Sequence, residues 1–152
     1  MYKIILLIVL IFGVFGANAQ QNYIDSLLHV VETTNNDTVK TNTYINIATS
    51  YQQSDTVKFL SYNKKALEIA KKINYKEGEA DVYTTYGMFY SIYTDFDLAI
   101  SYFEKAAVIC KKNDFKESLV SALGNAGNVY CYIGNYNKGL RLQIQRIFLH
   151  LF

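Results

Sequence analysis

The sequence predicts an all-α fold in which helical hairpins stack into a solenoid. Three observations support this prediction. The segment 80–116 resembles the segment 120–140 at a spacing of forty residues, a looser copy lies upstream over 44–77, and proline is absent from all 152 residues. A repeat of this period is typical of solenoids, whose units bury their apolar faces only by stacking. Because proline interrupts helices, its absence permits long ones.

The repeats align residue by residue. Tyr83, Gly87, Tyr90 and Phe96 correspond to Leu123, Gly127, Tyr130 and Tyr136. In the upstream copy, Tyr44, Ala48 and Tyr51 match the first helix at an offset of 39, whereas Ala66 and Ile69 match Ala106 and Ile109 at an offset of 40. We therefore expect the turn inside the first hairpin to be one residue shorter than in the second.

Residues 1–19 resemble a signal peptide. Lys3 precedes the apolar run from Ile4 to Gly16, and Ala17-Asn18-Ala19 has the small-x-small pattern that signal peptidase cleaves. The run spans about 20 Å as a helix, which is shorter than a hydrocarbon core of about 30 Å. We expect cleavage before Gln20 and export to the periplasm of a bacterial cell envelope. The alternative is an uncleaved segment that anchors the protein in the membrane.

The helices follow in order. A capping helix is expected within 20–37, because Ile24, Leu27, Leu28 and Val31 recur on one helical face. Three hairpins follow, with helices at 38–53 and 56–73, 76–93 and 96–112, and 116–133 and 136 to the end. They define repeats 38–75, 76–115 and 116–152, the last one degenerate or truncated in its second helix. Asp37, Asp55, Asp95 and Asn135 stand at expected N-cap positions.

These residues resemble the tetratricopeptide repeat family. In the middle copy, Tyr83, Tyr86, Gly87 and Tyr90 match the family's first helix, and Ala99, Phe103 and Ala106 match its second. The resemblance covers about 38–140, and it is weaker in the first copy, where Phe59 replaces a small residue. The forty-residue form without a closing proline is similar to the exported N-terminal sensor region of bacterial histidine kinases.

Catalytic patterns are missing from the sequence. The two histidines, His29 and His150, lie at opposite ends of the chain, and there is no metal-binding pair, glycine-rich phosphate loop or nucleophile elbow. Cys110 and Cys131 are expected to be too far apart on antiparallel helices for a disulfide. The net charge of +2, with lysines interleaved among glutamates, gives no footprint for nucleic acid. We expect a non-catalytic protein without a cofactor or metal.

The resemblance implies that the first helix of each hairpin lines a concave groove that binds a protein or peptide segment. The lining positions are Asn42, Asn46, Thr49, Gln52, Asp81, Thr84, Thr85, Met88, Ser91, Ser121, Asn125, Asn128 and Tyr132. They are polar and nearly uncharged, so the family's clamp for a terminal carboxylate is not expected. Tyr83, Tyr86, Tyr90 and Tyr93 share one helical face and are interpreted as core residues rather than a ligand platform.

The repeat pattern breaks after Leu140. Gln143 and Arg146 stand where Phe103 and Ala106 stood. One apolar stripe comprises Leu140, Ile144, Ile147, Phe148 and Leu151, and a second comprises Leu142, Leu149 and Phe152. A helix that is apolar on two faces needs two covers. Either a partner or a second copy of the chain covers it, or the chain is part of a longer protein, which is the preferred interpretation.

These observations predict an exported protein–protein interaction module, a scaffold or the sensor region of a signalling protein. The alternative is a helical-repeat receptor for a small molecule or glycan at the cell envelope. Such a receptor needs exposed aromatic side chains on its concave face, and Tyr132 is the one groove position that has an aromatic residue.

Overall fold

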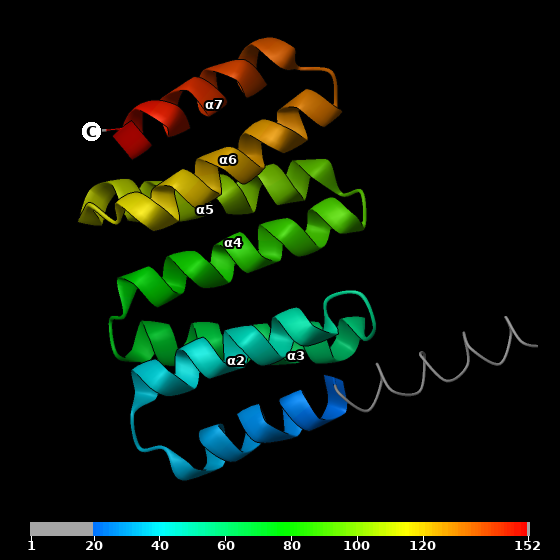
Figure 1. The fold of residues 1–152 in the computed structure, drawn as a ribbon, viewed down its shortest axis with the longest axis vertical. Helices are drawn as coiled ribbons and strands as arrows, with labels where there is room; N and C mark the ends of the chain where they lie inside the picture. The colour runs from blue at the N-terminus through cyan, green and yellow to red at the C-terminus, as the bar shows by residue number, and fades with distance from the viewer. Residues whose placement is uncertain (1–19, 152) are drawn as a thin grey trace, which may run out of the picture.

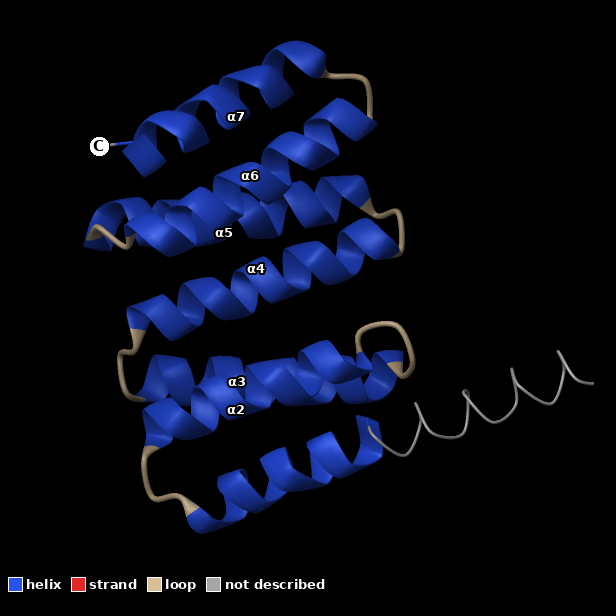
Figure 2. Ribbon diagram, in the orientation of Figure 1, coloured by secondary structure: helices blue, strands red, loops and turns tan. Residues whose placement is uncertain are grey.

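A computed structural model describes residues 20–151, and the predicted signal segment 1–19 lies outside this part of the chain. The described residues are helical and contain no strand (Figure 2). A helical segment over 20–33 precedes six helices: α2 (Asp37–Tyr51), α3 (Thr56–Lys72), α4 (Lys76–Ile92), α5 (Phe96–Asn113), α6 (Lys116–Tyr132) and α7 (Tyr136–Leu151). The predicted all-α hairpin solenoid is therefore confirmed, and the helix bounds agree with the expected ones within two residues.

The hairpins α2–α3, α4–α5 and α6–α7 stack along the long axis, with the segment 20–33 at one end and α7 at the other (Figure 1). Successive first helices α2, α4 and α6 contact one another. Among the described helices, α3, α5 and α7 have no such contacts with one another. The first helices therefore form the more crowded, inner row of a curved stack.

Side-chain caps fix where the second helices begin. Asp55, Asp95 and Asn135 each accept a hydrogen bond from the backbone N–H three residues later, as predicted. The predicted cap Asp37 is wrong by one residue. Asn36 is the N-cap of α2 and accepts from two backbone N–H groups, while Asp37 lies in the first turn, where its charge favours the helix dipole.

The expected shorter turn in the first hairpin is also wrong. α2 has 15 residues and α4 has 17, whereas the connecting loop 52–55 is longer than the loop 93–95. The first hairpin is therefore shorter because its first helix, α2, is shorter, and its turn is not. The other four turns between α2 and α7 each contain one residue at positive φ, namely Asn74, Thr94, Asp114 and Gly134. Loop 52–55 reverses the chain without a residue at positive φ.

Helices approach closely inside the second hairpin. A Cβ atom on Gly87 would lie 2.5 Å from the Phe103 ring, so only glycine fits there. In the first hairpin, Phe59 occupies the position of Ala99, and Asn63 occupies that of Phe103. Phe59 is fully buried and stacks on Phe89 with 4.1 Å between ring centroids. Relative to α5, the large and the small side chain of α3 have thus exchanged positions one helical turn apart. This exchange makes room for Phe59.

The tyrosines of α4 surround Tyr102 of α5. The ring centroids of Tyr83, Tyr86 and Tyr90 lie 6.1, 5.0 and 5.5 Å from that of Tyr102. Tyr86 is buried and the other two are half-buried, so the interpretation as core residues is confirmed for these three. It is wrong for Tyr93, which lies on the last turn of the stripe and is exposed.

Candidate functional site

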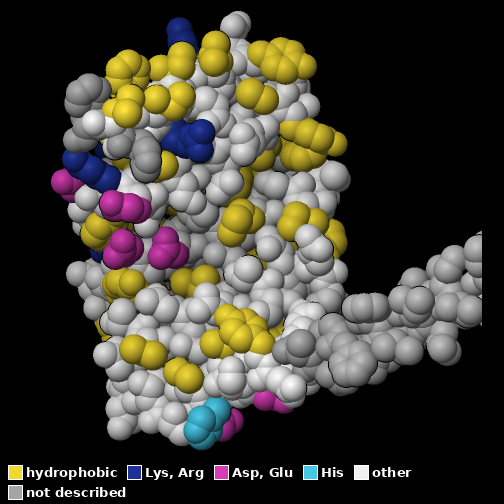
Figure 3. All heavy atoms as spheres, in the orientation of Figure 1, with side chains coloured by type: hydrophobic (Ala, Val, Ile, Leu, Met, Phe, Trp, Pro, Cys, Tyr) yellow, Lys and Arg dark blue, Asp and Glu magenta, His cyan; other side chains and the backbone are white. Residues whose placement is uncertain are grey.

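The candidate site is the face formed by α2, α4 and α6. The repeat offsets align its predicted residues in three rows: Asn42, Asp81 and Ser121; Asn46, Thr85 and Asn125; and Thr49, Met88 and Asn128. In the view of Figure 1, α2 and α6 lie in front of α3 and α5. Figure 3 shows the same face, on which hydrophobic patches and charged side chains are interspersed with uncharged polar side chains and backbone.

Most of the accessible groove residues lie on α2 and α6. Asn42, Asn46 and Thr49 are exposed on α2, and Ser121, Asn128 and Tyr132 are exposed on α6. The side chain of Asn128 accepts a hydrogen bond from Gln143, at 2.8 Å. The side-chain amides of Asn42, Asn46 and the half-buried Asn125 form no hydrogen bond with any other residue between 20 and 151. Their polar atoms are available for a ligand.

Two predicted groove residues are not available. Thr84 and Thr85 are buried because α4 packs directly against both α2 and α6. Their hydroxyls donate to backbone carbonyl oxygens of the same helix, Ala80 at 3.1 Å and Asp81 at 2.8 Å. Spacing alone places these residues on the inner row, but the neighbouring helices cover them. The prediction that they line the groove is therefore corrected.

Gln52 and Ser91 mark the end of the inner row next to the turns. Both are half-buried. The Ser91 hydroxyl donates to the Gly87 carbonyl at 2.8 Å. Gln52 Nε2 is buried and has no hydrogen-bond partner in the described part of the chain. These two residues contribute to the floor of the face rather than to its open surface.

Asp81 is the one carboxylate among the predicted groove residues. Ser118 donates to its Oδ1 at 3.3 Å, which links α4 to α6. Burial raises the pKa of Asp81 above its ordinary value, the hydrogen bond from Ser118 lowers it, and the nearby Glu77 carboxylate raises it further. Figure 3 shows acidic side chains gathered on this side of the face, where α4 and α6 begin. Basic side chains lie beside them, and Lys76 pairs with Glu79 at 3.0 Å, so this edge of the groove carries charges of both signs.

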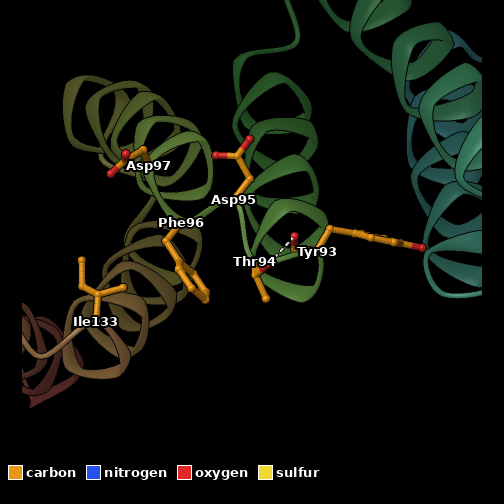
Figure 4. A pocket seen from close by; sticks show the side chains of 6 residues that line it. All are labelled: Tyr93, Thr94, Asp95, Phe96, Asp97 and Ile133. Atoms are coloured by element: carbon orange, nitrogen blue, oxygen red, sulfur yellow. Dashed lines mark hydrogen bonds between the residues drawn. The ribbon is translucent and has the colours of Figure 1, made fainter.

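Tyr132 has a neighbour that the sequence analysis missed. Its ring centroid lies 5.0 Å from that of Phe96, at the start of α5. A shallow hollow of about 520 Å³ lies beside Phe96, lined by Tyr93, Thr94, Asp95, Phe96, Asp97 and Ile133 (Figure 4). The Asp95 and Asp97 carboxylates point away from the Phe96 ring (Figure 4). No pattern within either repeat indicated this contact, because it joins two hairpins and Tyr132 corresponds to the non-aromatic Ile92.

The hollow offers no converging acid–base pair. Asp95 is engaged as the N-cap of α5, and Tyr93 points toward the first hairpin, where the Thr56 hydroxyl donates to its oxygen at 3.3 Å. Within residues 20–151, no group of three or more His, Cys, Asp or Glu side chains is placed to hold a metal ion. The arrangement provides contact surface rather than reactive groups.

The two cysteines are free thiols, one on α5 and one on α6. Cys110 is buried, and this burial, together with the Asp81 and Glu77 carboxylates, raises the pKa of its thiol to about 11. A thiol with such a pKa is almost entirely protonated at neutral pH and is a poor nucleophile. Cys110 therefore packs as a small apolar residue.

No helix in the described part of the chain combines the length and the apolar character that a membrane crossing requires. A comparison with protein-family models finds no match for this chain, and a comparison with curated proteins finds none either.

Proposed function

We propose that this protein is a non-catalytic protein–protein interaction module that binds a peptide segment of a partner across α2, α4 and α6. The unpaired amides of Asn42, Asn46 and Asn125 carry this proposal. Each asparagine side chain offers one acceptor and two donor hydrogens. Amides spaced along the inner row can therefore pair with the N–H and C=O groups of a peptide backbone.

The resemblance to the tetratricopeptide repeat supports the same face as the binding surface. Lysine and arginine are absent from the predicted groove positions, so recognition of a terminal carboxylate is not proposed. A polar, solvated face with few apolar anchors loses much of its binding energy to desolvation. We therefore expect the groove to bind its partner weakly and to tolerate different sequences.

We further propose that the protein works outside the cytoplasm, in the periplasm, as a scaffold or as the sensor region of a signalling protein. The signal-like pattern of residues 1–19 supports export. Mass spectrometry of the mature protein tests this proposal. A mature chain that begins at Gln20 would support export with cleavage, whereas an intact Met1 would indicate a retained N-terminal segment.

Site-specific photocrosslinking tests the groove. The amino acid p-benzoylphenylalanine replaces Asn46 in one variant and the exposed Ser61 of α3, away from the inner row, in a control. We expect a crosslinked polypeptide from position 46 and none from position 61. Adding the substitution Asn125→Leu should weaken the crosslink without lowering the melting temperature, because Asn125 makes no hydrogen bond that the fold would lose.

Other outcomes would contradict the proposal. Equal crosslinking from positions 46 and 61 would mean that the groove has no special role. A crosslinked glycan or small molecule at position 46, without a polypeptide, would favour the receptor function instead.

A further inference from the structure

The outer face of α7 is an exposed apolar stripe. Its members, about half exposed or more, are Leu140, Ile144, Ile147, Phe148 and Leu151. Figure 3 shows hydrophobic side chains gathered over this end of the molecule. A contiguous apolar patch of this kind on a folded protein marks an interaction surface.

Part of this surface is covered by a helix one repeat earlier. Ile100 of α5 packs under α6 and is 8% exposed, whereas the corresponding Leu140 is 59% exposed. Ala80 of α4 is buried between hairpins, whereas the corresponding Val120 is only partly covered. The end of the molecule thus exposes Leu140 and part of Val120 at positions that a helix covers one repeat earlier, whereas the α5 counterparts of Ile144, Phe148 and Leu151 are themselves exposed.

The aromatic residues at the starts of α5 and α7 show the same difference, since one is covered and the other is exposed. Phe96, at the beginning of α5, packs against Tyr132 at the end of α6. The corresponding Tyr136, at the beginning of α7, is 69% exposed. Tyr136 and Leu140 of α7 and Val120 of α6 therefore lie where a further helix would contact them if it packed across α7.

Two hollows lie along the stripe. One, of about 230 Å³, is lined by Val120, Arg146, Ile147 and Leu151. The other, of about 660 Å³, is lined by Asn135, Asn137, Lys138, Leu140, Arg141 and Ile144. Each hollow combines apolar side chains with one arginine, so each can receive an apolar side chain beside an acidic one.

The charge of this face is one-sided. α7 contains Lys138, Arg141 and Arg146 and no aspartate or glutamate. Lys138 is engaged, since its ammonium donates to the Tyr130 hydroxyl and lies 3.6 Å from Glu104. Arg141 and Arg146 form no ion pair with another described residue. At 100° per residue Arg141 lies next to the stripe, whereas Arg146 lies on the side toward α6, where its side chain packs against Gly124.

α7 carries basic side chains and no acidic ones. A second α7 brings only like charges. Self-association through α7 is therefore electrostatically unfavourable, whereas an acidic helix is complementary.

We propose that α7 and Val120 bind an amphipathic helix of a different protein. Its apolar residues recur at i, i+3 or i+4 and i+7 and enter the two hollows, and its carboxylates lie beside Arg141 and Arg146. This end surface is separate from the groove of the proposed function.

The test uses as its probe a fluorescein-labelled peptide with the sequence of residues 76–92, which contains Glu77, Glu79 and Asp81. Fluorescence anisotropy measures its binding to the purified protein. We expect binding to weaken at least about tenfold in Ile147→Asp and in Arg146→Glu. Binding should be unchanged in the control Val57→Asp, because Val57 is an exposed apolar residue on α3. Circular dichroism confirms that the variants keep their helices.

A peptide in which Glu77, Glu79 and Asp81 are replaced by Gln, Gln and Asn is the matched control, and it should bind more weakly. Four results would overturn the proposal. They are no binding up to about 1 mM peptide, equal binding to Ile147→Asp, a dimer in light scattering that Ile147→Asp dissociates, or sedimentation with vesicles of phosphatidylglycerol that the same substitution abolishes. The last two would assign the face to a second copy or to a lipid surface.

Discussion

The two ends of the solenoid differ in what they present to solvent. In the N-terminal segment 20–33, Ile24 is buried and Leu27, Leu28 and Val31 are half-buried. Its exposed positions include Asp25, Ser26, His29 and Glu32. α7 also turns one apolar face inward, through Leu142 and Leu149, but exposes a second. The N-terminal end exposes mainly polar side chains together with Tyr23 and Val30, whereas the C-terminal end exposes a stripe of five apolar side chains.

This difference shows that the hairpin by itself does not determine burial. Each repeat buries its faces against its neighbours, so a residue at the same position is core or surface according to what lies beside it. The third hairpin also replaces apolar packing with hydrogen bonds, because Gln143 donates to the Gly124 carbonyl at 3.1 Å.

The largest expected effect separates the two ends directly. Ile24→Asp buries a carboxylate where the side chain is 2% exposed, and we expect it to lower the free energy of unfolding by at least about 3 kcal/mol. Ile147→Asp changes a half-exposed side chain and should alter it by less than about 0.5 kcal/mol. Urea unfolding followed by circular dichroism measures both. Similar losses in the two variants would contradict the contrast between the ends.

The second prediction concerns the close approach of α6 and α7. A Cβ atom on Gly139 would lie 2.4 Å from Cys131 Sγ, so Gly139→Ala should cost about 1–3 kcal/mol. The second hairpin tolerates Ala99 at this position, and there Ser91 stands where Cys131 stands in the third. Cys131→Ser should therefore restore part of the loss. Urea titrations of the two single variants and the double variant measure this coupling, and strictly additive effects would argue against it.

The third prediction transfers a turn residue between repeats. Thr94 adopts φ +62°, and its counterpart Gly134 adopts φ +81°. Because a β-branched residue is strained in this region, Thr94→Gly should stabilise the protein by about 1 kcal/mol. The reverse change, Gly134→Thr, should destabilise it by a similar amount. The midpoints of urea unfolding measure both changes. The Thr94 hydroxyl donates to the Tyr93 carbonyl at 2.7 Å, and a lower midpoint for Thr94→Gly would mean that this hydrogen bond contributes more than the backbone strain costs.

The smallest effect is pH-dependent and lies in the middle of the stack. Burial raises the folded-state pKa of Asp81 above its ordinary value of 3.8, so the ionised carboxylate disfavours the folded state at neutral pH. Asp81→Asn keeps an acceptor for Ser118 and should raise the melting temperature slightly at pH 7. The gain should disappear as the pH falls through the folded-state pKa toward 3.8. A gain that does not change with pH would exclude this electrostatic cause.

Helix positions were largely predictable, because their causes are local. N-cap side chains and the apolar period lie within one or two turns of the backbone that they organise, and the forty-residue repeat shows that each hairpin recurs. The caps Asp55, Asp95 and Asn135 show this. The misplaced cap at Asp37 arose where two adjacent residues, Asn36 and Asp37, both have cap-forming side chains, and only the backbone geometry selects one.

The candidate site was less predictable, because exposure depends on neighbouring helices. Thr84 and Thr85 share the helical face of the other groove residues, yet the contacts of α4 with α2 and α6 bury them. The contact between Phe96 and Tyr132 joins two hairpins and has no local signal. The choice between groove surface and floor therefore required the stacked structure.

The sequence by itself determined that this protein is a stack of helical hairpins, because period, caps and apolar faces act within each repeat. The tertiary structure determined in which of the repeats a given position is buried. Phe59 and Asn63 exchange roles relative to Ala99 and Phe103, and Leu140 is exposed where Ile100 is covered. The physical reason is that burial depends on close packing against residues of the next hairpin, such as Phe89 for Phe59 and Val129 for Ile100, and the neighbouring hairpin supplies or withholds that packing.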